Sequence, residues 1–202
     1  MSLKLLVISD VHGEKRSLNR IKAVYHNHEP DLAVVCGDIT HFGDKEEAVV
    51  YLEKIPMDVI GIVGNCDPKG VEDAYKEVEA YYLHLNPIEI DGVRFIGLSG
   101  SNYSDDMLKE FKKLSNDSDV FVLHQPPYSY LDKTSRGKNI GDEKLLSIID
   151  ENKPKLVLSG HVHEDKGIIE EEGTVYLNPG PAHNDNLAIV EISKDGIRGK
   201  LL

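Results

Sequence analysis

The chain is poor in several features that define large classes of proteins. It has only two cysteines in 202 residues, Cys36 and Cys66, which are too few for a disulfide-stapled fold. It also lacks an excess of basic residues, since 23 Lys and Arg against 35 Asp and Glu give a formal net charge of −12. That balance argues against non-specific nucleic-acid binding and against attachment to an anionic membrane. A small anionic substrate held by metal ions stays compatible with it, because a bound cation dominates its local field.

Long apolar runs, repeats and flexible linkers are missing as well. No apolar run approaches the length of a membrane span, and the amino-terminal residues do not resemble a secretory leader. A chain of 202 residues is the size of one average domain and can bury a core without disulfides. We therefore expect a single domain over residues 1–202 in a cytoplasmic protein. The sequence leaves open whether the protein is a homo-oligomer.

What the sequence does contain is a series of short apolar runs, each followed by a polar residue that can bind metal. The five runs are 5–8, 32–36, 59–63, 120–123 and 156–159. Their β-branched residues are typical of strands buried on both faces. Amphipathic segments with helical spacing lie between the runs, and one begins with Asp44 and Glu47 in a capping-box pattern. The first half therefore predicts parallel strands in a βαβαβ arrangement. Glycines after Asp91 and Asp195 predict hairpins, so we expect an α/β fold with either one mixed sheet or two sheets.

The polar residues at the ends of these runs carry carboxylate, amide or imidazole groups. They are Asp10, His12, Asp38, Asn65, His124, His161 and His163. Ligands of open α/β sheets bind outside the carboxyl ends of the strands, so neighbouring strands would bring these groups to one rim. Each residue alone is more simply explained as part of a turn or loop. Five strand ends that supply only chelating groups favour a metal centre instead.

Seven such groups can hold two divalent ions if one group bridges them. Asp38 is the natural bridge, because a carboxylate has two oxygens. In each of the pairs Asp10/His12 and His161/His163, the two side chains are expected to point to the same side. Nitrogen and oxygen ligands without thiolate favour Mn²⁺, Fe²⁺, Ni²⁺ or Zn²⁺, with Mn²⁺ preferred, over Ca²⁺ or Mg²⁺. A water between two such ions becomes a nucleophile at neutral pH, and the same ions neutralise phosphoryl oxygens.

The strand-end motifs occur in a fixed order along the chain. They are Asp10-Val-His12, Gly37-Asp38, Gly64-Asn65, His124 and Gly160-His161-Val-His163. Together they resemble the motifs of the calcineurin-like metallophosphoesterases, and the resemblance covers nearly the whole chain. The stretches 124–141 and 178–180 are similar to a compact prokaryotic branch of predicted phosphoesterases. The resemblance implies a four-layer α/β/β/α sandwich, in which two stacked mixed sheets are flanked by helices.

The same resemblance implies a ligand set for two ions. One ion would take Asp10, His12, Asp38 and His163, and the other would take Asp38, Asn65, His124 and His161. A hydroxide that bridges the ions would then attack phosphorus in line, while Asn65 steadies the equatorial oxygens. Catalytic roles are thus expected for Asn65 and Asp38.

The chain departs from the family pattern at Cys66. The family usually has a histidine here, which is credited with protonating the leaving oxygen, whereas this chain reads Gly64-Asn65-Cys66-Asp67. General acid catalysis contributes about 10²–10⁴-fold, so the loss matters. The substrates have good leaving groups, or His41 or Asp67 replaces the acid, or the centre turns over slowly. Related members with cysteine here are reported as phosphodiesterases, which favours the first two explanations.

Substrate contacts are predicted from loops near the rim. The candidates are Asn65, Asn102, His41 and Arg136. Arg136 belongs to the long segment 128–141, which is either a solvated surface loop or a lid that faces phosphate. His183 follows Asn178-Pro-Gly-Pro181 in another predicted loop that could approach the rim.

These observations favour a metal-dependent phosphodiesterase that hydrolyses small or nucleotide-like diesters. A protein Ser/Thr phosphatase ranks lower, because the chain lacks the usual acid and is short for a protein-docking face. A nuclease is disfavoured by the net charge of −12. A non-catalytic metal-binding scaffold of the same fold is the alternative from another class, and the complete ligand set argues against it.

Overall fold

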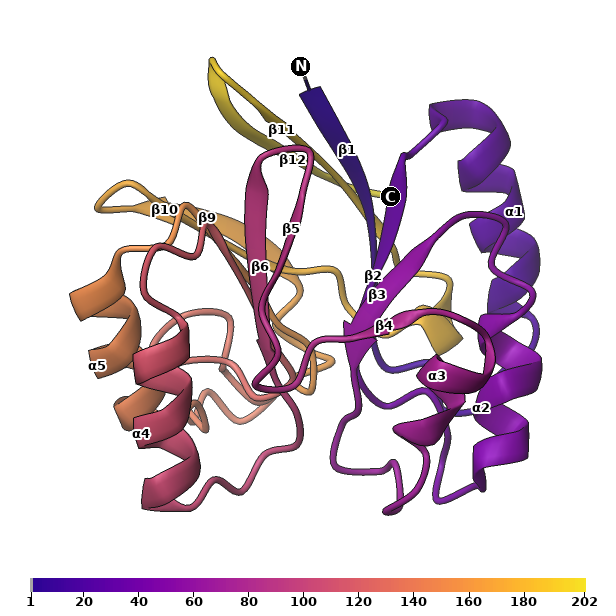
Figure 1. Cartoon of the computed structure of the whole chain (residues 1–202), viewed down its shortest axis with the longest axis horizontal. Helices are drawn as coiled ribbons and strands as arrows, with labels where there is room; N and C mark the ends of the chain where they lie inside the picture. The colour runs from indigo at the N-terminus through magenta and orange to yellow at the C-terminus, as the bar shows by residue number, and fades with distance from the viewer. Residues whose placement is uncertain (1) are drawn as a thin grey trace.

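The computed structural model describes residues 2–202, which form twelve strands, five α-helices and one short 3₁₀ helix (Figure 1). The strands are β1 (Ser2–Ile8), β2 (Leu32–Cys36), β3 (Val59–Ile62), β4 (Tyr81–Tyr82), β5 (Ile88–Ile90), β6 (Val93–Leu98), β7 (Val120–Leu123), β8 (Leu156–Leu158), β9 (Gly167–Glu171), β10 (Thr174–Asn178), β11 (Ala188–Ser193) and β12 (Gly196–Leu201). The helices are α1 (Ser17–His28), α2 (Lys45–Leu52), α3 (Asp73–Glu77), α4 (Asp105–Leu114), α5 (Glu143–Asn152) and the 3₁₀ helix η1 (Ala182–Asn184). No helix within residues 2–202 has the length and apolar character needed to cross a bilayer.

The strands form two mixed sheets of six strands each. Their orders are β12-β11-β1-β2-β3-β4 in sheet A and β5-β6-β7-β8-β10-β9 in sheet B. β1, β2 and β3 are parallel, as are β6, β7 and β8, so three carboxyl ends meet at one edge of each sheet. The turns at Asp91 and Asp195 join antiparallel neighbours, as predicted. The expected α/β fold with two mixed sheets is confirmed.

Three apolar layers explain why the strands are continuously apolar. In β1, Leu6 and Ile8 pack with α1, α2 and α3, whereas Leu5 and Val7 pack between the two sheets. On the far side, Phe121 of β7 packs beneath α4 and α5. Side chains alternate along a strand, so a strand covered on both faces needs an apolar residue at every position. The helices flank the paired sheets in Figure 1, which confirms the four-layer α/β/β/α sandwich.

The carboxyl-terminal hairpin completes sheet A. β11 pairs with β1 in antiparallel register, with Lys4 opposite Glu191, although the two strands are far apart in sequence. The connection from β10 in sheet B to β11 in sheet A therefore passes the carboxyl end of β1. There the N–H of Ala182 donates to the carbonyl of Ser9 at 2.8 Å. This crossing brings η1 to the loop where the first predicted metal ligands lie.

Leu5 tests the layer between the sheets. Leu5→Ala should lower the free energy of unfolding by about 2–5 kcal/mol, because it leaves a cavity at a fully buried position. Val50→Ala is the control on α2, where the side chain is 37% exposed, and it should cost less than about 0.5 kcal/mol. Urea unfolding followed by circular dichroism measures both changes. Equal losses in the two variants would contradict the assigned core.

Candidate metal centre

The loops after β1 and β2 are joined backbone to backbone. The N–H of Asp10 donates to the carbonyl of Gly37 at 3.1 Å, and the N–H of His12 donates to the carbonyl of Asp38 at 3.0 Å. Asp10, His12 and Asp38 all have left-handed backbones, with φ of 53°, 50° and 53°. Such angles are costly for residues other than glycine, so the joined loops must hold them. Asp10 and His12 thus converge through these turns and not through strand alternation, because β1 ends before them.

The first part of the cluster surrounds the buried carboxylate of Asp10. Nε2 of His163 lies 3.1 Å from its Oδ1, and the backbone N–H of His161 donates to its Oδ2 at 3.0 Å. Nε2 of His12 lies 3.9 Å from Oδ1 of Asp10 and 3.4 Å from Nε2 of His163. Three potential ligand atoms, one each from Asp10, His12 and His163, are therefore within 4.8 Å of one another.

The second part of the cluster surrounds Asp38. Oδ2 of Asp38 lies 3.8 Å from Nε2 of His12 and 3.4 Å from Nε2 of His124. Nε2 of His124 also lies 2.9 Å from Oδ1 of Asn65, while its Nδ1 lies 2.9 Å from the carbonyl of Cys36. A carbonyl only accepts, so Nδ1 carries a proton and Nε2 is the nitrogen directed at the cluster. Asp38 thus sits between the His12 side and the His124 side, where a bridging ligand belongs.

His161 and His163 do not share one neighbour. The ring of His161 lies 5.1 Å from that of His124, whereas His163 contacts Asp10. The two side chains therefore have different neighbours, which differs from the expectation that they point to the same side. His161 has a left-handed backbone, with φ of 66°, which turns the chain between the two residues. Their separation matches the assignment to two different ions that the family resemblance implies.

Burial and neighbouring charges have opposite effects on the pKa values of Asp10, Asp38 and His124. Burial raises the pKa of Asp10, but hydrogen bonding to His163 and the nearby His124 outweigh it and hold that pKa well below its usual range. Burial likewise opposes the hydrogen bond from His124 that lowers the pKa of Asp38. For His124, burial is outweighed by the hydrogen bond and charge of Asp38, which raise its pKa to about 9. Burial lowers the pKa of His12, which favours the neutral ring that a metal ligand requires.

The donor set fits divalent transition-metal ions. Two buried carboxylates, one amide and four imidazoles meet at one place, which suits Mn²⁺, Fe²⁺, Ni²⁺ or Zn²⁺. His12 and His163 both direct Nε2 toward the same oxygen of Asp10. Within residues 2–202, Nδ1 of His12 and Oγ of Ser9 are buried without hydrogen-bond partners. This arrangement resembles ligands around a cation more closely than a self-sufficient polar core.

Two glycines of the motifs leave room for the carboxylates. A Cβ on Gly64 would lie 2.1 Å from Oδ1 of Asp38. A Cβ on Gly160 would lie 1.8 Å from Oγ of Ser9 and 2.7 Å from Oδ2 of Asp10. No real Cβ makes contacts this short, so the loops after β3 and β8 approach the carboxylates only because these two positions lack a side chain.

Asp67 has a different place from the one expected of a catalytic acid. Its Oδ1 accepts from the N–H and hydroxyl of Thr40 at 2.8 and 2.9 Å, and its Oδ2 accepts from Ile39 and Gly64 at 3.1 and 2.9 Å. Burial raises its pKa, and the backbone donors oppose that rise. All four donors come from the loops after β2 and β3, so the carboxylate ties these loops together. This placement does not fit the predicted role of Asp67 in proton donation.

The predicted substrate contacts are only partly brought together. His41 is exposed, and its ring lies 5.4 Å from that of His12. Asn102 and Arg136 are also exposed. Within residues 2–202, their side chains form no hydrogen bond or ion pair. The segment 128–141 folds back on itself, and the N–H of Ser135 donates to Glu164 at 3.3 Å, next to His163. Arg136 is therefore next to a residue that contacts Glu164 beside His163, but no contact within residues 2–202 directs its side chain toward the site.

The structure adds His183 to the site. Its Nδ1 lies 2.9 Å from the carbonyl of Asp10, and its ring lies 5.2 Å from those of both His12 and His163. The Asn178-Pro-Gly-Pro181 segment indicated a loop before it, but its position depends on the pairing of β11 with β1. That pairing joins the two ends of the chain, and no local signal reveals it.

Comparisons with known proteins agree with this architecture. The family model of the calcineurin-like phosphoesterases matches residues 3–165. The uncharacterized protein MJ1162 of Methanocaldococcus jannaschii is 30% identical over 200 residues, covering 89% of this chain and 88% of that protein. A protein of Arcobacter nitrofigilis named "Probable glycerophosphodiester phosphodiesterase GpdQ" is 28% identical over 213 residues, covering 87% and 77%. A dimetal phosphatase from Danio rerio has a similar fold, with a TM-score of 0.68 at 13% identity over 98% of this chain and 95% of that one.

Asp67 provides a test of how the loops are held. Asp67→Ala should lower the free energy of unfolding by about 3 kcal/mol, because each buried donor left without an acceptor costs about 1–3 kcal/mol. Asp58→Ala is the control, since Asp58 is exposed before β3, and it should change stability by less than about 0.5 kcal/mol. Urea titration measures both. A loss below about 1 kcal/mol in Asp67→Ala would contradict the tethering role.

Proposed function

The chain belongs to the calcineurin-like phosphoesterase family, and we propose on that basis that it is a dinuclear metal-dependent hydrolase of phosphate esters. We further propose that small or nucleotide-like phosphodiesters are its preferred substrates. The observation that carries the proposal is the position of Asp38, whose buried carboxylate lies between His12 and His124. A buried carboxylate between two imidazoles does not stabilise an apolar core, but it can bind two cations at once.

Each ion has its own side of Asp38 in this proposal. One ion would be held by Asp10, His12, Asp38 and His163, and the other by Asp38, Asn65, His124 and His161. When bound, a pair of divalent cations supplies an activated water for attack on phosphorus and neutralises the phosphoryl oxygens. Mn²⁺ is the ion that we propose, and Fe²⁺, Ni²⁺ and Zn²⁺ suit the same donors.

Residues of the chain orient these ligands and the substrate. The N–H of Cys66 donates to Oδ1 of Asp38 at 2.7 Å, so Oδ2 is the oxygen left for the cations. Asn65 turns its carbonyl oxygen toward His124, and its amide nitrogen lies 3.3 Å from the sulfur of Cys66. Because Asn65 is exposed, its amide nitrogen can also donate to a phosphoryl oxygen of a bound ester. Asn65 thus links ion binding to substrate orientation.

Where the leaving oxygen of an ester needs a proton, His41 is the residue that we propose to donate it. Burial and the charge of Asp38 raise the pKa of the Cys66 thiol to about 12, which makes it a poor acid at neutral pH. Both carboxylate oxygens of Asp67 accept hydrogen bonds from the loops after β2 and β3. His41 is exposed beside His12 and is free to reach a bound substrate.

The preference for diesters rests on two observations. A site without the family's usual imidazole suits esters whose leaving oxygen needs little protonation, such as aryl or nucleotide-like diesters. The Arcobacter nitrofigilis relative carries the name of a glycerophosphodiester phosphodiesterase. A comparison of an aryl phosphodiester with a phosphoserine peptide tests this preference, and faster hydrolysis of the peptide would favour a protein phosphatase instead.

Asp38 tests the dinuclear assignment. Asp38→Ala should lower Mn²⁺ affinity and hydrolysis of an aryl phosphodiester by more than about 100-fold, since even loss of a residue that only supports a ligand costs 10–100-fold. Asp119→Asn is the control, because Asp119 precedes β7 at the opposite edge of the sheet. Calorimetric titration with Mn²⁺ and a chromogenic assay measure the two effects. Turnover like that of the wild type in Asp38→Ala would contradict the mechanism.

The protonation of His124 predicts a pH dependence of metal binding. Its pKa of about 9 exceeds the ordinary value, so in the metal-free protein at neutral pH the ring carries a second proton, on Nε2, in addition to the one on Nδ1. A cation must displace that proton, and the apparent Mn²⁺ affinity should therefore rise up to tenfold per pH unit between pH 7 and about 9. Calorimetry in buffers of different ionisation enthalpy counts the released proton. An affinity that stays constant over this range would show that no proton leaves.

A further inference from the structure

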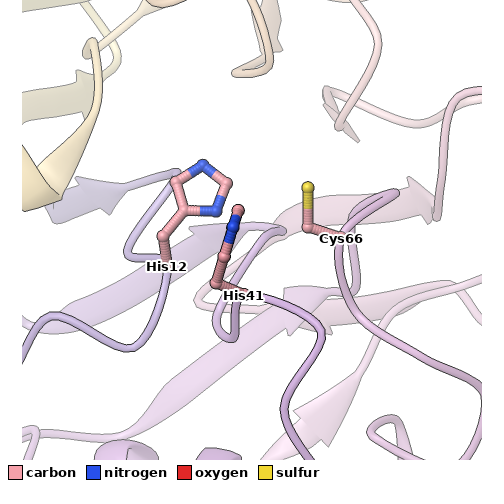
Figure 2. Close-up of side chains that lie close together, drawn as sticks. All are labelled: His12, His41 and Cys66. Atoms are coloured by element: carbon pink, nitrogen blue, oxygen red, sulfur yellow. The ribbon is translucent and has the colours of Figure 1, made fainter.

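A second group of metal-binding side chains lies beside the centre. One potential ligand atom from each of His12, His41 and Cys66 lies within 4.8 Å of the other two. Figure 2 shows the three side chains in a row, with a ring nitrogen of His12 turned toward His41 and the sulfur of Cys66 on the far side. They come from the loops after β1, β2 and β3. Neither His41 nor Cys66 belongs to the ligand set assigned above.

The loops hold His41 and Cys66 next to each other. The N–H of Phe42 donates to the carbonyl of Cys66 at 2.9 Å, which ties the residue after His41 to the cysteine. The N–H of Cys66 is itself bonded to Oδ1 of Asp38. The proximity of the imidazole and the thiol is therefore built into the backbone.

The donors differ in kind from those around Asp38. Two imidazoles and one sulfur, without a carboxylate, are the ligands that Zn²⁺ and its substitute Co²⁺ accept readily. At metal–ligand distances of about 2.0–2.3 Å, the ligand atoms of one tetrahedral ion lie about 3.3–3.8 Å apart. The ligand atoms of His12, His41 and Cys66 lie within 4.8 Å of one another, and rotation of the exposed His41 side chain can bring them to these shorter separations.

One ring nitrogen of His12 lacks a hydrogen-bond partner within the described residues. Nδ1 of His12 is buried and forms no hydrogen bond within residues 2–202, while Nε2 of the same ring faces Asp10, Asp38 and His163. Among the residues that the structure describes, the sulfur of Cys66 has one hydrogen-bond donor, the amide of Asn65 at 3.3 Å. A cation between these groups would complete contacts that the polypeptide leaves open.

We propose that His12, His41 and Cys66 form an additional site, which shares His12 with the main centre, for a thiophilic divalent cation such as Zn²⁺, and that an ion there inhibits hydrolysis. Binding releases two protons to solvent, one from the thiol of Cys66, which becomes a thiolate, and one from Nδ1 of His12, whose ring then bridges the two kinds of ion as an imidazolate; water is the remaining ligand. The ion engages His41, the proposed proton donor, and binds the sulfur that lies 3.3 Å from the amide of Asn65, so it competes with the two groups that serve the ester in the proposed function. Binding stands apart from the proposed function, whereas inhibition rests on it.

Cobalt absorption tests the binding directly. Co²⁺ is added to protein already saturated with Mn²⁺, and a thiolate-to-cobalt charge-transfer band in the near ultraviolet reports a bond to sulfur. The band should form in the wild type, disappear in Cys66→Ser and need at least tenfold more Co²⁺ in His41→Ala. Cys36→Ala removes the other cysteine, which is buried in the core, and should keep the band. No band in the wild type, a band in Cys66→Ser, or an unchanged titration in His41→Ala would overturn the site.

Zinc inhibition tests the consequence. With Mn²⁺ held constant, Zn²⁺ should inhibit aryl diester hydrolysis, and Cys66→Ser should need at least tenfold more Zn²⁺ for half-inhibition relative to its own uninhibited rate. Equal sensitivity of the two proteins would overturn the inhibitory role. A cobalt–sulfur band in a protein that hydrolyses no phosphate ester would contradict the proposed function and leave the cation site standing.

Discussion

The whole site depends on burying two carboxylates beside each other. Asp10 and Asp38 are almost inaccessible to water, with 1% and 2% of their side chains exposed. Two such charges repel in a low-dielectric interior unless cations or hydrogen-bond donors compensate them. His163, His124 and backbone N–H groups supply part of that compensation. A pair of divalent ions would supply the rest, which is why a fold that tolerates these carboxylates is suited to phosphate chemistry.

The fold meets this requirement with parallel strands and unusual loops. Parallel strands in both sheets end at a common rim, and the backbone then turns sharply through left-handed residues and glycines. Asp67 ties the loops after β2 and β3 beneath the rim, and His183 is held against Asp10 from the far end of the chain. The ligands are therefore positioned by contacts that lie outside the ligand set, as in other metal sites.

Much of this arrangement could be predicted from the sequence, because its signals are local. Each apolar run marks a strand buried on both faces, and each is followed by its polar residue, so the rim and its seven candidates follow from chain order and parallel topology. The family resemblance supplied the layers and the ligand pairing. Cys66 departs from the family's usual histidine, and His41 is the nearby imidazole that the sequence offers in its place.

The rest depended on contacts that no local pattern encodes. Asp67 follows Cys66 in the motif and looks catalytic, yet its orientation is set by donors from the loop after β2. His161 and His163 are separated by a backbone turn that the His-x-His spacing does not reveal. The position of His183 requires β11 to pair with β1. In each case the deciding partner lies on another part of the chain.

Anomalous X-ray scattering from crystals of the full chain soaked in Mn²⁺ tests the central claim most directly. The account predicts two manganese peaks about 4 Å apart, one on each side of the Asp38 carboxylate. Absence of manganese next to Asp38 under saturating conditions, or one ion that engages the ligands of only one side, would contradict it.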